Sequence, residues 1–109
     1  MSKQLNFNYK GTEYTLEFTR RTVAQMEREG FVADDLGTKP MTMLPTLFAG
    51  AFKAHHRYVK REVIDEIYSV ITNRAELIGK LTEMYNEPIM ALIDEPTESA
   101  ENLTWTPSW

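Results

Sequence analysis

The chain of 109 residues contains no cysteine. Disulfide bonds, thiolate nucleophiles and the commonest structural zinc sites are therefore excluded. The sequence also lacks any apolar run that approaches the roughly 20 residues of a membrane-spanning helix. Its first residues lack the apolar core of a signal peptide. We therefore expect a soluble, intracellular protein that does not contact a membrane.

Over most of its length the chain has no excess of either charge. Residues 1–93 contain all twelve Lys and Arg residues and twelve of the sixteen Asp and Glu residues. The formal net charge of −4 therefore comes entirely from Asp94, Glu95, Glu98 and Glu101. Binding to nucleic acid in general requires an excess of cations that neutralise phosphates. We expect no nucleic-acid partner.

The N-terminal residues alternate in the way that a β-hairpin requires. Apolar and polar residues alternate over 5–9 and again over 14–18, and Lys10 and Gly11 between them are a turn signal. One face would carry Leu5, Phe7, Tyr9, Tyr14, Leu16 and Phe18. A lone hairpin is marginal in water, so this face must lie on the helices that follow.

The first two helices have start and stop signals. Thr19 is expected to cap a helix over residues 20–29, with Gly30 and Phe31 forming a Schellman-type stop that contacts Met26. Thr42 is expected to cap the second helix, with Pro45 in its first turn. One helical stripe then follows the 3-4-3-4-3 spacing: Leu44, Leu47, Phe48, Ala51, Phe52 and His55.

Two more helices follow, the first over about 60–71. Asn73 and Glu76 have the spacing of a capping box for the last helix, which Pro88 is expected to kink and which continues to about Ile93. The predicted fold class is α+β: an N-terminal two-stranded β-hairpin packed on three or four mainly antiparallel helices. Residues 1–93 would form this single domain, and residues 94–109 a disordered acidic tail.

No group of residues indicates catalysis or a cofactor. His55 and His56 point about 100° apart on a helix and lack a third ligand, so we expect one packed ring, one solvated ring and no metal. The carboxylate pairs Asp34–Asp35 and Asp65–Glu66 are expected to be solvated. We expect a protein that is not an enzyme and needs no cofactor.

The sequence also contains two basic clusters. Arg57, Lys60 and Arg61 flank Tyr58 and are typical of a helix end. Arg20 and Arg21 stand at a helix start, where cations are unfavourable. A carboxylate is therefore expected beside Arg20 and Arg21, from either Glu17 or a binding partner.

The strongest signal for a partner lies at the C-terminal end. Leu103, Trp105 and Trp109 are large apolar residues in the acidic tail, and Trp is enriched in binding hot spots. We expect them to bind another protein; the alternative is that the tail folds back and an indole packs on the body. Met41 and Met43 either fill the core or add adaptable apolar surface for a partner.

The order of these features resembles a known family. The features are Phe7-x-Tyr9-Lys-Gly11-x-x-Tyr14-x-Leu16, Met26-Glu-x-x-Gly30, Leu47-Phe-x-Gly50-Ala-Phe52, His55-His56, and Leu81-x-x-Met84-Tyr85, before the terminal Trp-Thr-Pro-Ser-Trp. Over nearly the whole chain, they are similar to small tail assembly chaperones of long-tailed bacteriophages. They are most similar to a family of unknown function from tail modules of phages and prophages of Gram-positive bacteria.

This resemblance implies a chaperone that coats the tape-measure protein in the host cytoplasm and recruits tail-tube subunits. Such a protein would be absent from the mature virion, and self-association is compatible with it. A programmed frameshift that adds a second domain is known in such phages. The alternatives are a structural tail-completion or head–tail connector component, and a small regulatory protein that acts on the host.

Overall fold

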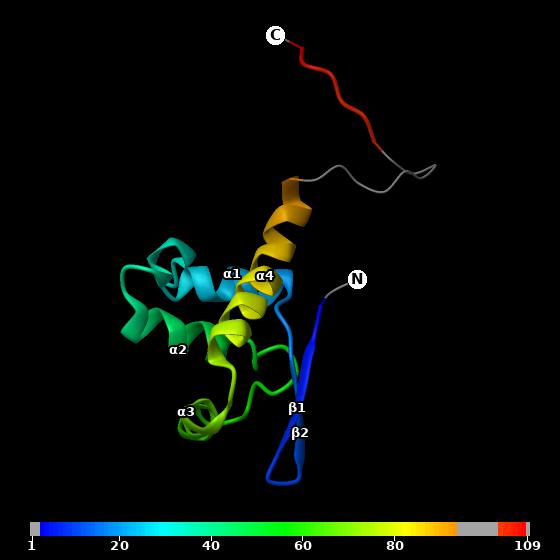
Figure 1. Cartoon of the computed structure of the whole chain (residues 1–109). Helices are drawn as coiled ribbons and strands as arrows, with labels where there is room; N and C mark the ends of the chain where they lie inside the picture. The colour runs from blue at the N-terminus through cyan, green and yellow to red at the C-terminus, as the bar shows by residue number, and fades with distance from the viewer. Residues whose placement is uncertain (1–2, 94–102, 109) are drawn as a thin grey trace.

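The computed structural model describes residues 3–93 and 103–108 and has the predicted α+β fold. A two-stranded antiparallel sheet comes first, and α-helices and one short 3-10 helix follow (Figure 1). The elements are β1 (Leu5–Tyr9), β2 (Thr12–Leu16), α1 (Arg20–Arg28), η1 (Ala33–Leu36), α2 (Pro40–Gly50), α3 (Arg61–Val70) and α4 (Arg74–Ile93).

The hairpin has the register that its alternating residues predict. Leu5 lies opposite Leu16, and Phe7 lies opposite Tyr14. Lys10 and Gly11 both have positive φ, +50° and +82°, as a tight two-residue hairpin turn requires. The second strand is Thr12–Leu16, two residues earlier than expected. It ends there because the N–H of Glu17 donates to the carbonyl of Ala51, 3.0 Å away.

Both ends of α1 are closed as the sequence predicts. Thr19 Oγ1 accepts from the N–H of Thr22 at 3.2 Å, and Thr22 Oγ1 accepts from the N–H of Thr19 at 2.8 Å. At the other end the N–H of Phe31 donates to the carbonyl of Met26 (2.9 Å), and that of Gly30 donates to Glu27 (3.1 Å). These two bonds form a Schellman motif.

The predicted start of α2 was wrong, and the helix ends before the predicted stripe does. The helix begins at Pro40, with Lys39 and not Thr42 as N-cap. Proline suits the first helical position because its φ is preset and no N–H is needed there. Pro45 therefore lies inside the helix and not in its first turn. The helix ends at Gly50 because the next N–H groups, those of Phe52 and Lys53, bond three residues back and tighten the chain.

The other helices differ less from expectation. α3 is one residue shorter at each end than the predicted 60–71, and α4 continues through Pro88 to Ile93 as expected. Asn73 and Glu76 contact each other, but the Asn73 amide donates to the Glu76 carboxylate (2.6 Å). The two residues are therefore joined by a bond between their side chains. A capping box would instead join each side chain to the backbone N–H of the other residue.

The core forms where α2 meets α1, α3 and α4, and where the segment after α2 meets the hairpin. The ring of Phe52 connects the hairpin with α2. It lies edge-on to Phe7 (6.3 Å) and Tyr14 (5.7 Å) of the hairpin and to Phe48 (5.1 Å) of α2. On the α4 side, Tyr85 contacts Phe18 and Phe31 in the same way. Each such buried side chain contributes about 1.5–3 kcal/mol. The side chains buried most completely are Phe48, Phe52, Leu16, Met26, Leu47, Ile67 and Leu81.

The expected tail is described only in part. Residues 103–108 form no helix or strand and are exposed. The prediction of disorder over 94–102 and at Trp109 lies outside the described residues.

Candidate functional site

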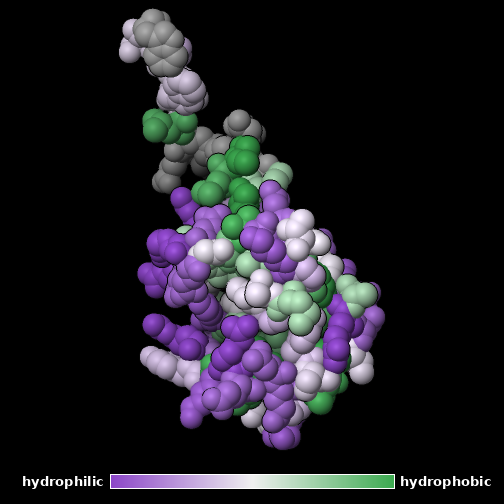
Figure 2. All heavy atoms as spheres, turned by 90° about the vertical axis from the view of Figure 1, so that its left-hand side faces the viewer, coloured by the Kyte–Doolittle hydropathy of each residue, from purple (hydrophilic) through white to green (hydrophobic). Residues whose placement is uncertain are grey.

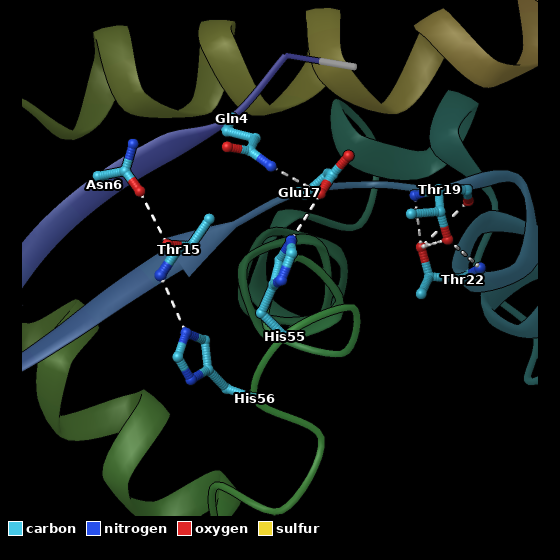
Figure 3. A network of polar contacts seen from close by, with 8 residues as sticks. All are labelled: Gln4, Asn6, Thr15, Glu17, Thr19, Thr22, His55 and His56. Carbon is cyan, nitrogen blue, oxygen red and sulfur yellow. Dashed lines mark hydrogen bonds and ion pairs between the residues drawn. The ribbon is translucent and has the colours of Figure 1, made fainter. Parts of the chain in front are cut away.

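The two histidines have structural roles in a polar network (Figure 3). His56 Nε2 accepts from the N–H of Thr15 (2.9 Å) on the side of β2 that does not face β1, and its ring packs on Tyr14 (5.1 Å). His55 Nε2 lies 2.6 Å from Oε1 of the buried Glu17. His56 is half-buried and His55 more exposed, and the two rings bind different partners.

Within the described ranges 3–93 and 103–108, no three His, Cys, Asp or Glu side chains lie close enough to hold a metal ion. The two neighbouring carboxylates of α3, Asp65 and Glu66, bind different partners. Asp65 accepts from Arg61 Nε at 3.1 Å, while Glu66 accepts from the Tyr9 hydroxyl and from Lys10 Nζ. The Tyr9 hydrogen bond, with help from Lys10, lowers the pKa of Glu66. Glu66 therefore anchors the hairpin tip to α3, while Asp65 pairs within the helix.

The surface feature that stands out is an apolar groove between α1 and α4. Val23 and Ala24 of α1 face Pro88, Ile89 and Leu92 of α4 across a hollow of about 170 Å³. Arg20 and Glu27, about two turns apart on α1, add a charge of each sign to the rim.

The groove continues past the end of α1. Glu27 and Ile89 also line a second hollow of about 380 Å³, together with Phe31, Val32 and Tyr85. The two hollows therefore form one surface along α4, and we call this surface the α1–α4 groove.

The last turn of α4 extends the apolar surface beyond the groove. Met90, Leu92 and Ile93 are all exposed, although earlier residues of the same helix, such as Leu81 and Tyr85, are buried. In Figure 1 this end of α4 projects past the body of the molecule. Figure 2 shows hydrophobic atoms gathered there, where the chain leaves the body. Contiguous apolar surface of this kind is typical of sites that bind proteins.

The residues predicted as partner contacts lie in separate places. Met41 is 88% exposed at the start of α2, but Met43 packs partly against the core. Leu103 and Trp105 are exposed, and at 78% exposure the Trp105 indole does not pack on the body. Trp109 lies outside the described residues. Of the four that the structure describes, Met41, Met43, Leu103 and Trp105, none lines the α1–α4 groove.

The groove residues were missed, although the sequence contains a signal for them. All five positions of α4 that follow Pro88 (89–93) are apolar, so apolar side chains surround the end of the helix. A helix that packs on a domain by one face can bury only one stripe. The excess apolar residues had to be exposed or bound by something else.

Comparison with known proteins gives a family and no function. Residues 1–109 match the family described as a domain of unknown function (DUF5055). The chain belongs to this family. Searches of curated proteins and of solved structures found no match. Among the helices described for this family member, none has the length and apolar character needed to cross a bilayer.

Proposed function

We propose that this protein is a non-catalytic assembly chaperone of bacteriophage tails. It binds the tape-measure protein in the host cytoplasm, keeps that long protein soluble and helps recruit tail-tube subunits. The α1–α4 groove and the exposed end of α4 are the proposed binding surface. The observation that carries the proposal is the apolar last turn of α4, because it continues the groove and has no cover among the described residues.

The chemistry of the groove suits an amphipathic helix. A helix that binds in a groove inserts apolar residues spaced three and four apart, and the floor of Val23, Ala24 and Leu92 offers a matching apolar strip. Arg20 and Glu27 on the rim can orient the bound helix through charges of opposite sign. A tape-measure protein is long, helical and apolar-striped, so it would offer many such segments.

The C-terminal residues are proposed as a second contact. Leu103 and Trp105 are exposed and free of the body, so they can bind another chain without unfolding the domain. In this proposal, these residues and Trp109 bind a tail-tube subunit while the groove holds the tape measure. Two linked contacts raise the effective concentration of one partner near the other.

The test is co-expression with the tape-measure protein encoded in the same tail module. We expect the tape measure to become soluble and to co-elute with the chaperone in size-exclusion chromatography. Leu92→Asp should weaken the complex at least about ten-fold, since it removes an apolar contact and buries a carboxylate. The matched control is Val70→Asp, because Val70 also ends a helix and is similarly exposed (57% against 59%).

Unchanged solubility of the tape measure, with no complex, would contradict the proposal. If Val70→Asp abolishes the complex and Leu92→Asp does not, the binding surface is instead the hollow between β1 and α3 that Val70 lines. Mass spectrometry of purified phage particles separates a chaperone from a tail-completion or connector protein. A chaperone is expected to be absent, and stoichiometric amounts would assign it to the virion.

A further inference from the structure

A second cleft lies on the other flank of α1. It is bounded by the first turns of α1 and by the segment that follows α2, and its volume is about 400 Å³. Three cationic residues line it: Arg21, Lys53 and Arg57. The neutral groups Thr19, Thr22 and Gln25 also line it, and among the described residues no Asp or Glu does. We call it the basic cleft.

Most of its positive charge has no ion-pair partner in the part of the chain that the structure describes. Lys53 Nζ lies 2.8 Å from Oε1 of Glu29, which offsets one charge. Over residues 3–93 and 103–108, neither Arg21 nor Arg57 forms an ion pair. The Arg57 guanidinium lies only over the ring of its neighbour Tyr58, 5.5 Å from its centre. Two guanidinium groups are thus available in a chain whose net charge is −4.

The helix that forms one wall adds to this potential. The first turn of α1 contains no acidic residue and carries Arg20 and Arg21 instead. Cations at a helix N-terminus oppose the helix dipole and cost stability, whereas an anion bound there is favourable. The Glu17 carboxylate, one of two partners expected for these arginines, instead contacts His55 and Gln4. Within 3–93 and 103–108 no ion pair joins Arg20 or Arg21 to a carboxylate, so a bound carboxylate would be favourable beside Arg21.

We propose that the basic cleft binds an acidic peptide segment of a protein partner. Guanidinium groups bind carboxylates through two parallel hydrogen bonds, and the Thr and Gln side chains can add neutral contacts. The cleft is too large for one small anion, and it offers far fewer cations than a nucleic-acid strand needs. α1 separates it from the α1–α4 groove, so a polypeptide bound in the groove can place acidic residues in the cleft. The inference does not depend on the partner's being a tape-measure protein.

Fluorescence anisotropy with a labelled hexaglutamate peptide and the full chain tests this at low ionic strength. We expect saturable binding that weakens with salt. The double variant Arg21→Gln/Arg57→Gln should bind about ten-fold or more weakly, because it removes two charge-assisted contacts. The control Arg28→Gln/Arg61→Gln has the same net charge but lies outside the cleft, and should bind within about two-fold of the parent. Circular dichroism verifies that each variant is folded, and the loop variant Arg57→Gln alone should weaken binding in the same direction.

Three results would overturn the inference. The first is no binding by the parent protein, and the second is equal weakening in both double variants, which would mean unspecific attraction. The third comes from a labelled single-stranded oligonucleotide with the same number of charges. If it binds more tightly than the peptide and depends on Arg21 and Arg57, the cleft is a nucleic-acid site.

Discussion

Gly30 ends α1 with a φ of +98°, in the left-handed region that glycine adopts at no steric cost. A Cβ at this position would meet no other atom, so Gly30→Ala would impose backbone strain alone. We expect the free energy of unfolding to fall by about 1 kcal/mol, measured by urea denaturation.

Gly79→Ala is the matched substitution inside a helix. Gly79 lies exposed in α4, and a Cβ there also meets no other atom. Alanine in a helix is more stable than glycine by about 0.5–1 kcal/mol, so this variant should gain stability. If both variants change the free energy of unfolding in the same direction, the positive φ of Gly30 does not account for the effect of Gly30→Ala.

His56 makes the fold sensitive to acid. Its partial burial, and secondarily the charge of His55, lower its pKa below the usual 6.5. The unfolded chain then takes up a proton at a higher pH than the folded chain does. Stability should therefore be full above pH 6.5 and should fall as the pH drops from 6.5 toward the lower pKa of the folded state.

His56→Gln tests this interpretation, because a glutamine side chain can still accept a hydrogen bond from the Thr15 N–H but does not titrate. Urea denaturation between about pH 8 and pH 5 should show a smaller loss of stability in the variant than in the parent. Equal losses would assign the acid sensitivity to other groups.

The sequence alone indicated a packed ring and a solvated ring. Which ring packs depends on the position of β2, and adjacent residues cannot reveal that.

At the scale of secondary-structure elements, α2 contains a proline where a helix does not favour one. Pro45 lies five residues after Pro40, at a position where a helix residue donates its N–H to the preceding turn. Proline has no N–H, so this hydrogen bond is missing. Pro45→Ala should raise the free energy of unfolding by about 1 kcal/mol, after subtracting the entropy that proline removes from the unfolded chain.

The control for this prediction is Pro40→Ala. Pro40 occupies the first helical position, where no N–H bond is lost, so stability should change by less than about 0.5 kcal/mol. Thermal denaturation followed by circular dichroism measures both variants. A larger gain at Pro40 than at Pro45 would show that the helix does not begin where the structure places it.

The elements differ in how far the sequence determines them. The hairpin and the Schellman motif at Gly30 depend on neighbouring residues, and both were predicted correctly. The start of α2 was missed because two start signals, Pro40 and Thr42, lie within three residues of each other. The α1–α4 groove could not be located from the sequence, since α1 ends at Arg28 and α4 begins only at Arg74. Only the excess of apolar residues after Pro88 pointed to an uncovered surface.

At the scale of the whole molecule, α1 separates two surfaces of different chemistry. One flank contributes Val23 and Ala24 to the apolar groove, and the other contributes Arg21 and Gln25 to the basic cleft. A polypeptide that combines an apolar stripe with acidic residues fits both surfaces. Such dual recognition would discriminate a particular partner from other exposed apolar helices, which lack the acidic residues.

The domain of residues 1–93 should fold without the rest of the chain. α4 ends at Ile93, and Leu103 and Trp105 are exposed, so these residues add nothing to the core. Removal of residues 94–109 should therefore leave the far-UV circular dichroism of the helices unchanged. The melting temperature should shift by less than about 4 °C, which corresponds to less than about 1 kcal/mol for a domain of this size. A larger drop would mean that part of the removed segment packs on the body, and the boundary after Ile93 would then be wrong.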